Sequence, residues 1–159
     1  AVVNPKQEDC KYPFKLLCGA GVAYKLISIV YKRIGADVLE LEEFLEFMAI
    51  ATVGDIVDLI DENRVVVKYG LKHIAHTNNI GLRTLVEECS VDINDISSYH
   101  IGFVIGPCLN ASGRLDTAKK AIELMMCKNK EKARTMAREL ITLNDERKQM
   151  TEEETAKAV

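Results

Sequence analysis

The sequence has no tryptophan, and aromatic residues make up only 6% of its 159 positions. A hydrophobic core must therefore be built from Leu, Ile, Val, Ala and Met side chains. The sequence also lacks an apolar run near the ~20 residues that a membrane-spanning helix needs, and no signal peptide is visible at its start. We therefore expect a protein that does not cross a membrane.

Cysteine pairs of the Cys-X-X-Cys type are also lacking, and the total of five cysteines is odd. Both features argue against a disulfide framework and against a structural zinc knuckle. We expect free thiols, in a reducing cytoplasm, at Cys10, Cys18, Cys89, Cys108 and Cys127. There is no excess of positive charge, because the net charge is −3. Binding of a polyanion would then depend on a local patch or on a metal ion.

Apolar residues make up 48% of the sequence, which is typical of a globular protein. They recur mostly at helical spacing and predict a mostly α fold. The helix expected at residues 19–34 should be mostly buried, and residues 130–158 should form a connecting helix of roughly 40 Å. Further helices are expected at residues 40–51, 62–76 and 82–89, and from a cap at Asp116 or Thr117 to Cys127. The apolar run Ala1–Val3 is interpreted as a short edge strand.

The first candidate for chemistry is Asp55, within the segment Ala51–Leu59. It follows Gly54 in an apolar setting, where a carboxylate is costly unless it is paired or bound to a metal. Hard divalent cations prefer oxygen ligands of this kind. A helix N-cap at Asp55 or Asp58 is the more common use of an aspartate, and the residues alone leave both interpretations open.

The second candidate is the segment Gly106–Arg114, which is predicted to be a loop before a helix. Its glycines would let backbone N–H groups approach a phosphate, and Arg114 offers a two-pronged match to phosphate oxygens. An ordinary turn with Arg114 on the surface is the alternative, and composition does not decide between the two. His73 and His76 could share a metal, although no third ligand is apparent nearby.

Several segments together resemble the RecJ branch of the DHH phosphoesterase family. They run in the family's order through nearly the whole chain: Val3–Lys6, Tyr12–Lys15, Cys18–Leu26, Ala51–Leu59, Glu62–Arg64, Gly106–Leu115 and Asn144–Arg147. Ala51–Leu59 is similar to the family's fourth motif, and Gly106–Leu115 to its loop Gly-Pro-Arg-Ile-Asn-Ala-Ala-Gly-Arg-Leu. Cys108 stands here in place of the first arginine of that loop.

The resemblance implies roles for individual residues. Asp55 would bind a catalytic Mn2+ or Mg2+ ion, which favours the metal interpretation over the cap. Asn110 and Arg114 would contact the DNA phosphate near the scissile bond, while Ser112 and Gly113 would shape the loop. The fold implied is the C-terminal part of an α/β DHH phosphoesterase domain over residues 1–128. Residues 129–159 would then form a linker helix toward a second domain.

The function implied is cleavage of single-stranded DNA by a 5′-to-3′ exonuclease, through metal-dependent phosphodiester hydrolysis in DNA repair and recombination. The family's paired aspartates and its Asp-His-His triplet do not occur in these residues, so we expect this chain alone to be inactive. Two alternatives remain: a phosphodiesterase of short oligonucleotides or cyclic dinucleotides, and a non-catalytic nucleic-acid scaffold. The presence of both Asp55 and Arg114 argues against the scaffold.

Overall fold

The computed structural model describes residues 2–115 and 118–158, apart from the side chains of residues 38, 114, 115 and 158. The chain divides into two compact units, Ala1–His76 and Thr77–Val159. The predicted caps at Asp116 and Thr117 lie outside the described residues. None of the helices in the described ranges is both long and apolar enough to cross a membrane.

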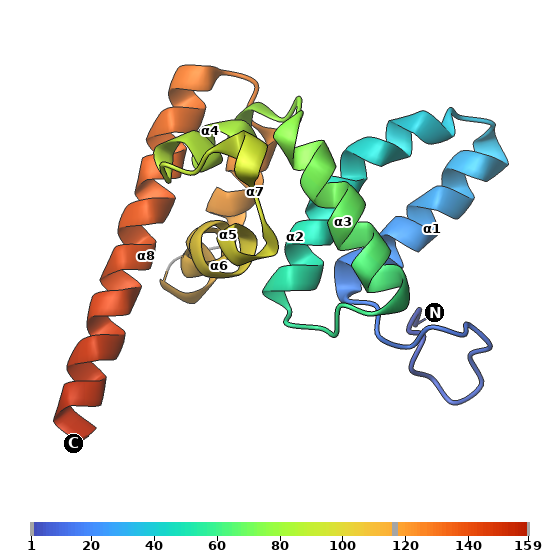
Figure 1. Ribbon diagram of the computed structural model, residues 1–159, viewed down its shortest axis with the longest axis horizontal. Helices are drawn as coiled ribbons and strands as arrows, with labels where there is room; N and C mark the ends of the chain where they lie inside the picture. The colour runs from blue at the N-terminus through green and yellow to red at the C-terminus, as the bar shows by residue number, and fades with distance from the viewer. Residues whose placement is uncertain (1, 116–117, 159) are drawn as a thin grey trace. The chain divides into compact units, whose positions relative to one another are not determined.

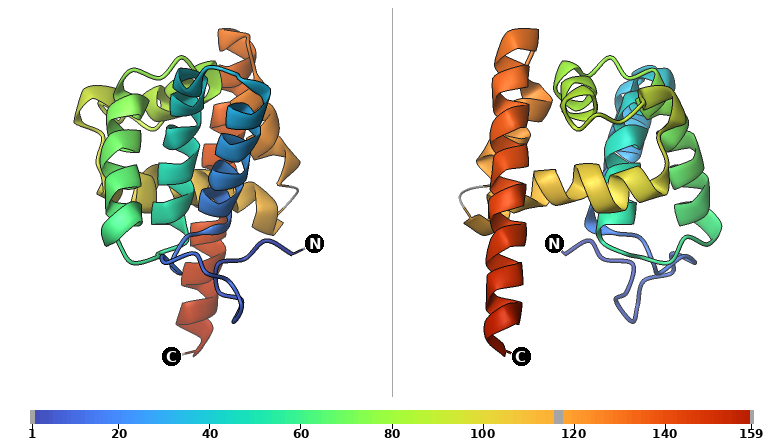
Figure 2. Two further views of the ribbon diagram at one scale, coloured as in Figure 1. Left: turned by 90° about the vertical axis from the view of Figure 1, so that its right-hand side faces the viewer. Right: turned by 60° about the vertical axis from the view of Figure 1, so that its left-hand side comes forward.

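The first unit contains three α-helices and one 3-10 helix. These elements are α1 (Gly19–Ile34), the 3-10 helix η1 (Val38–Phe44), α2 (Leu45–Gly54) and α3 (Asp61–Ala75). The three α-helices lie side by side (Figure 2). Phe14 and Leu17 of the N-terminal segment pack with Met48 of α2 in a buried cluster. A segment that forms neither helix nor strand therefore contributes to the core of this unit.

The close contact between α2 and α3 depends on Gly70. A Cβ atom at this position would collide with the Cβ of Ala49 and lie only 2.6 Å from the carbonyl oxygen of Leu45. Gly70 therefore lets the backbones of the two helices approach each other more closely than any other residue would allow.

The second unit contains the remaining helices. These are α4 (Ile80–Glu88), the 3-10 helix η2 (Ile93–Asp95), α5 (Ser98–His100), the π-helix η3 (Ile101–Ile105), α6 (Gly106–Leu115), α7 (Lys119–Met126) and α8 (Lys130–Ala158). The N-terminal half of α8 packs on α4, α6 and α7, and Ala133, Ala137 and Leu140 are fully buried there (Figure 1). Burial along α8 ends at Asn144, so its C-terminal half extends into solvent, as its sequence predicts.

The structure confirms the mostly helical fold and several helix positions. Helix α1 has the predicted limits, and the choice of helix for residues 62–76 is confirmed by α3. The predicted burial of α1 is wrong, however, because Leu26, Ile29 and Val30 are 52%, 54% and 46% exposed. The helical spacing correctly identified an apolar face, but the first unit supplies too few partners to cover it.

Two further expectations are corrected. No strand forms in the described residues, since Val2 and Val3 are 78% and 63% exposed and a strand needs a partner to pair with. The expected loop at Gly106–Arg114 is helical, because η3 and α6 form a continuous helix. The N–H of Gly106 donates to the carbonyl of Ile101, and this wide turn makes room for Pro107, whose ring would clash in a regular helix.

Candidate functional site

Asp55 lies at the C-terminal end of α2. Its backbone N–H donates to the carbonyl of Ala51 at 2.8 Å, while its side chain is exposed. The N-cap alternative is wrong for both aspartates, since the N-cap of α3 is Ile60. A carboxylate at this end of a helix faces the negative pole of the helix dipole, which costs about 0.3–1 kcal/mol unless a cation is near. Asp55 therefore does not stabilise α2 through the helix dipole.

The turn at residues 55–60 is held in an unusual backbone conformation. Ile56 has φ 53° and is 90% exposed, and Asp61 has φ 41° where α3 begins. Left-handed backbone is unfavourable for a β-branched residue, by about 1–3 kcal/mol, and it persists only where the surroundings enforce it. The turn that carries Asp55 is therefore strained on the exposed side of the first unit.

Asn63 is the buried residue that holds this turn. It lies in the first turn of α3 and is fully buried. Its Nδ2 donates to the carbonyl of Asp58 at 3.0 Å and to the carbonyl of Leu16 at 2.9 Å. One side chain thus connects the turn of Asp55 to the N-terminal segment.

Glu62, the neighbour of Asn63, forms a second connection between the same two segments. Its carboxylate accepts a hydrogen bond from the Tyr12 hydroxyl at 2.6 Å and pairs with Lys25 of α1 at 2.6 Å. Burial raises the pKa of Glu62, but the hydrogen bonds from Lys25 and Tyr12 and the Lys25 charge outweigh it, so the pKa lies below its usual value. Lys25 also lies over the Tyr12 ring, 5.7 Å from its centre.

The lowered pKa of Glu62 predicts a pH dependence of stability. Because the carboxylate is favoured in the folded state, its contribution is complete above the usual pKa of 4.5 and is lost as the pH falls through the lower folded value. Glu62→Gln should therefore lower the free energy of unfolding of the first unit at neutral pH. In acid, the free energies of the variant and of the wild type should become more similar. Urea unfolding at both pH values measures this. Glu154→Gln, in an exposed pair with Lys157, should show no such change.

The residues predicted to bind phosphate lie on α6 in the second unit. Asn110 and Gly113 are exposed, and both are accessible to a ligand. Ser112 is fully buried, and its hydroxyl donates to the carbonyl of Leu109 at 3.2 Å, so it packs the helix rather than shaping a loop. The backbone of Arg114 lies in α6, but its side chain lies outside the described part of the structure. Its meeting with Asp55 in one cleft stays a prediction.

Cys108 is buried in α6, at 3% exposure. Its thiol shares a hydrogen bond with that of Cys89, and this bond raises the pKa of Cys89. All five cysteines are free thiols, as predicted. His73 lies 3.6 Å from the Glu42 carboxylate, and no group of three metal-binding side chains occurs among the described residues.

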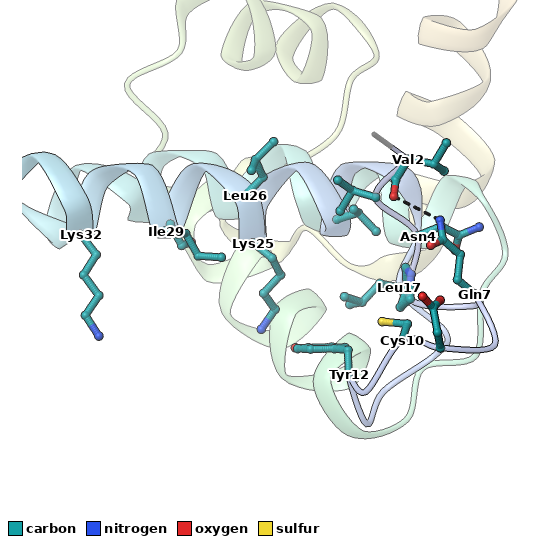
Figure 3. A pocket seen from close by; sticks show the side chains of 15 residues that line it. Val2, Asn4, Gln7, Cys10, Tyr12, Leu17, Lys25, Leu26, Ile29 and Lys32 are labelled. Carbon is teal, nitrogen blue, oxygen red and sulfur yellow. Dashed lines mark hydrogen bonds between the residues drawn. The ribbon is translucent and has the colours of Figure 1, made fainter.

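An apolar groove of about 600 Å³ lies between the N-terminal segment and α1 (Figure 3). Leu26 and Ile29 of α1 line one side, and Val2 and Leu17 lie at the other. The side chain of Gln7 closes one end by donating to the carbonyl of Val2 at 3.1 Å. None of the predicted site residues lines this groove, so the groove is separate from the candidate site.

No family model matches the chain, but individual relatives do. It is 38% identical to the single-stranded-DNA-specific exonuclease RecJ of Bacillus subtilis. The match covers the whole of this chain and 20% of the length of that relative. It is 34% identical to RecJ of Escherichia coli over 94% of the chain and 28% of the relative. The chain therefore spans less than a third of the curated relatives it matches.

Solved structures give the same result. The crystal structure of RecJ from Thermus thermophilus in complex with Mn2+ matches 95% of the chain and 22% of its own length, with a TM-score of 0.83 and 31% identity. A structure of exonuclease RecJ bound to manganese matches 92% of the chain with a TM-score of 0.83 and 30% identity. The fold is thus that of a segment of a DHH-type phosphoesterase. More narrowly, the chain belongs to the RecJ family.

Among the residues at the site, sequence reasoning missed the structural roles of Ile56 and Asn63. The triplet Glu62-Asn63-Arg64 follows the family pattern, and this was the available signal. The acceptor at Leu16 is 47 positions away from Asn63, so no local pattern could predict the contact.

Proposed function

We propose that the full-length protein is a 5′-to-3′ single-stranded-DNA exonuclease that hydrolyses phosphodiester bonds with Mn2+ or Mg2+, acting in repair and recombination in the cytoplasm. The observation that supports this most strongly is the similarity of the whole chain to proteins named as such exonucleases, at 38% identity in one case. We further propose that residues 1–128 complete a catalytic domain and that residues 129–159 lead to a second one.

Asp55 is proposed as one ligand of the metal. Its carboxylate is exposed, and no partner of Asp55 is found among the residues whose side chains the structure describes, which do not include Arg114. Carboxylate oxygens suit Mn2+ and Mg2+, and a cation here would also offset the negative pole of α2. When bound, such ions hold the phosphate, lower the pKa of a water molecule and stabilise the leaving oxygen.

Asn110 and Arg114 are proposed as the groups that bind the DNA phosphate. Asn110 is exposed on α6, and an amide N–H can donate to a phosphate oxygen. A guanidinium at position 114 would match phosphate oxygens and stabilise the extra negative charge of the transition state. Gly113, which is also exposed, would leave room for the strand beside these two side chains.

The test is digestion of a labelled single-stranded oligonucleotide by the full-length protein. We expect cleavage with Mn2+ or Mg2+, with products released from the 5′ end, and none with EDTA. A double-stranded oligonucleotide should remain intact. The 159-residue chain alone should neither bind Mn2+ tightly nor cut, because one aspartate cannot hold two metal ions.

The other outcomes separate the alternatives. Cleavage of dinucleotides or cyclic dinucleotides in preference to long strands would assign a small-substrate phosphodiesterase. Binding of single-stranded DNA without any metal-dependent cleavage would assign a scaffold. Robust digestion by the chain alone would contradict the proposed division of the active site.

A further inference from the structure

The turn that carries Asp55 needs an external support. Its backbone leaves α2 at Gly54 and enters α3 at Asp61, and both Ile56 and Asp61 have positive φ angles. Short turns of this kind relax when nothing holds them, because the relaxed conformations are lower in local energy. A metal ligand on such a turn would be displaced together with its backbone.

Asn63 supplies the support from the interior. Its side chain is fully buried, and its Nδ2 group donates to two carbonyl oxygens, at Asp58 within the turn and at Leu16 in the N-terminal segment. Phe14 and Leu17, the neighbours of Leu16, are themselves in the core of the first unit. The amide therefore anchors the exposed turn to a rigid part of the molecule.

The orientation of this amide is fixed by its surroundings. If it were reversed, three oxygen acceptors would face one another, so the Nδ2 atom must point at the two carbonyls. The Oδ1 atom is then left buried without a partner in the described part of the chain. Most buried polar atoms have a hydrogen-bond partner. Because Oδ1 of Asn63 has none among the described residues, the two hydrogen bonds that Nδ2 donates account for the asparagine at this position.

We propose that Asn63 is a positioning residue for Asp55, which holds the turn at residues 55–60 in the conformation that presents the carboxylate to a metal before the metal arrives. The inference rests on the proposed role of Asp55 as a metal ligand. Supports of metal ligands raise affinity by fixing the ligand's direction, and their loss typically costs about 10–100-fold in metal affinity or activity.

The test uses the full-length protein with Asn63→Ala and with Asn63→Asp, which keeps the size of the side chain. Two quantities are measured: the Mn2+ concentration that gives half-maximal cleavage, and hydrogen exchange of the peptide that covers residues 55–60. Asn144→Ala is the matched control, because Asn144 is also buried, at 3% exposure, but lies in α8 of the second unit.

We expect both Asn63 variants to raise the half-maximal Mn2+ concentration about 10-fold or more. Hydrogen exchange at residues 55–60 should accelerate, and saturating Mn2+ should recover part of the rate. The control should keep the wild-type metal dependence. If Asn63→Ala does not fold, Asn63→Asp alone decides. Unchanged metal dependence and unchanged exchange at residues 55–60 would overturn the proposal.

The failure of this inference can be distinguished from that of the proposed function. Faster exchange at residues 55–60 without any change in metal dependence would show that Asn63 holds the turn but does not position a metal ligand. That outcome would overturn the positioning role, whereas the activity of Asp55→Ala tests separately whether Asp55 binds the metal. Unchanged exchange with a metal-dependent wild-type enzyme would overturn the role of Asn63 alone.

Discussion

Asp55→Ala in the full-length protein is expected to abolish cleavage of single-stranded DNA while the fold survives. Removal of a metal ligand should cost more than the removal of its supporting residues, so the rate should fall by at least about 100-fold. The fold should survive because the Asp55 side chain is exposed and its helix hydrogen bond to Ala51 comes from the backbone. Asp55→Asn should behave in the same way, since an amide oxygen without charge is a far weaker ligand.

Two measurements test this expectation. The first is the rate of oligonucleotide digestion at several Mn2+ concentrations, and the second is the thermal stability of each variant. Asp95→Asn is the matched control, because Asp95 is another exposed aspartate, in η2 of the second unit. Near-normal activity of Asp55→Ala would exclude Asp55 as a metal ligand. The proposed nuclease activity would then require a metal site that does not include Asp55.

The stability of Asp55→Ala gives independent information. Replacement of an aspartate at the C-terminal end of α2 removes an unfavourable interaction with the helix dipole. We therefore expect the variant to be as stable as wild type or slightly more stable in the absence of metal. Loss of activity with unchanged or increased stability is typical of a residue retained for function.

Much of the helical structure could be predicted because periodicity reports directly on burial. In α8 the stripe that includes Ala133, Ala137 and Leu140 is fully buried, as its spacing indicates. The same reasoning failed for α1, where the apolar face is real but exposed. Periodicity identifies a face that is suited to packing, but it does not identify the element that covers it.

The error at Gly106–Arg114 has a different cause. Glycine and proline are typical of loops, so their presence concealed a helical pattern in Ile101, Ile105 and Cys108, all of which are buried. A π-helical turn that precedes Pro107 is a tertiary feature with little signature in the sequence. Family resemblance drew attention to this segment but did not predict its conformation.

The candidate site was predicted in part. The resemblance pointed to Asp55, and the structure removed the capping alternative by placing Asp55 at the end of α2 rather than the start of α3. The support from Asn63 was not predictable, because hydrogen bonds between residues 47 positions apart depend on the finished fold. The sequence can therefore suggest a residue that binds the metal, but the residues that would orient it are found only in the folded structure.

Among substitutions that add one methyl group to the first unit, Gly70→Ala is expected to destabilise the protein most. The new Cβ would collide with the Cβ of Ala49 and lie 2.6 Å from the carbonyl oxygen of Leu45, a backbone atom that cannot rotate away. Helices α2 and α3 would have to separate, which should cost about 3 kcal/mol, at the upper end of the usual cost of overpacking. This exceeds the ~1 kcal/mol by which alanine is favoured over glycine inside a helix.

Gly19→Ala is the control, since nothing lies within 4 Å of a Cβ at that position. It should leave stability unchanged or raise it by up to about 1 kcal/mol. Local opening energies from hydrogen exchange measure Gly70→Ala in α2 and α3 and Gly19→Ala in α1. Because the turn of Asp55 joins these two helices, Gly70→Ala should also weaken Mn2+-dependent cleavage, although position 70 is part of no proposed ligand set. Wild-type exchange of Gly70→Ala in α2 and α3 would show that the two helices do not approach as closely as the Gly70 contacts indicate.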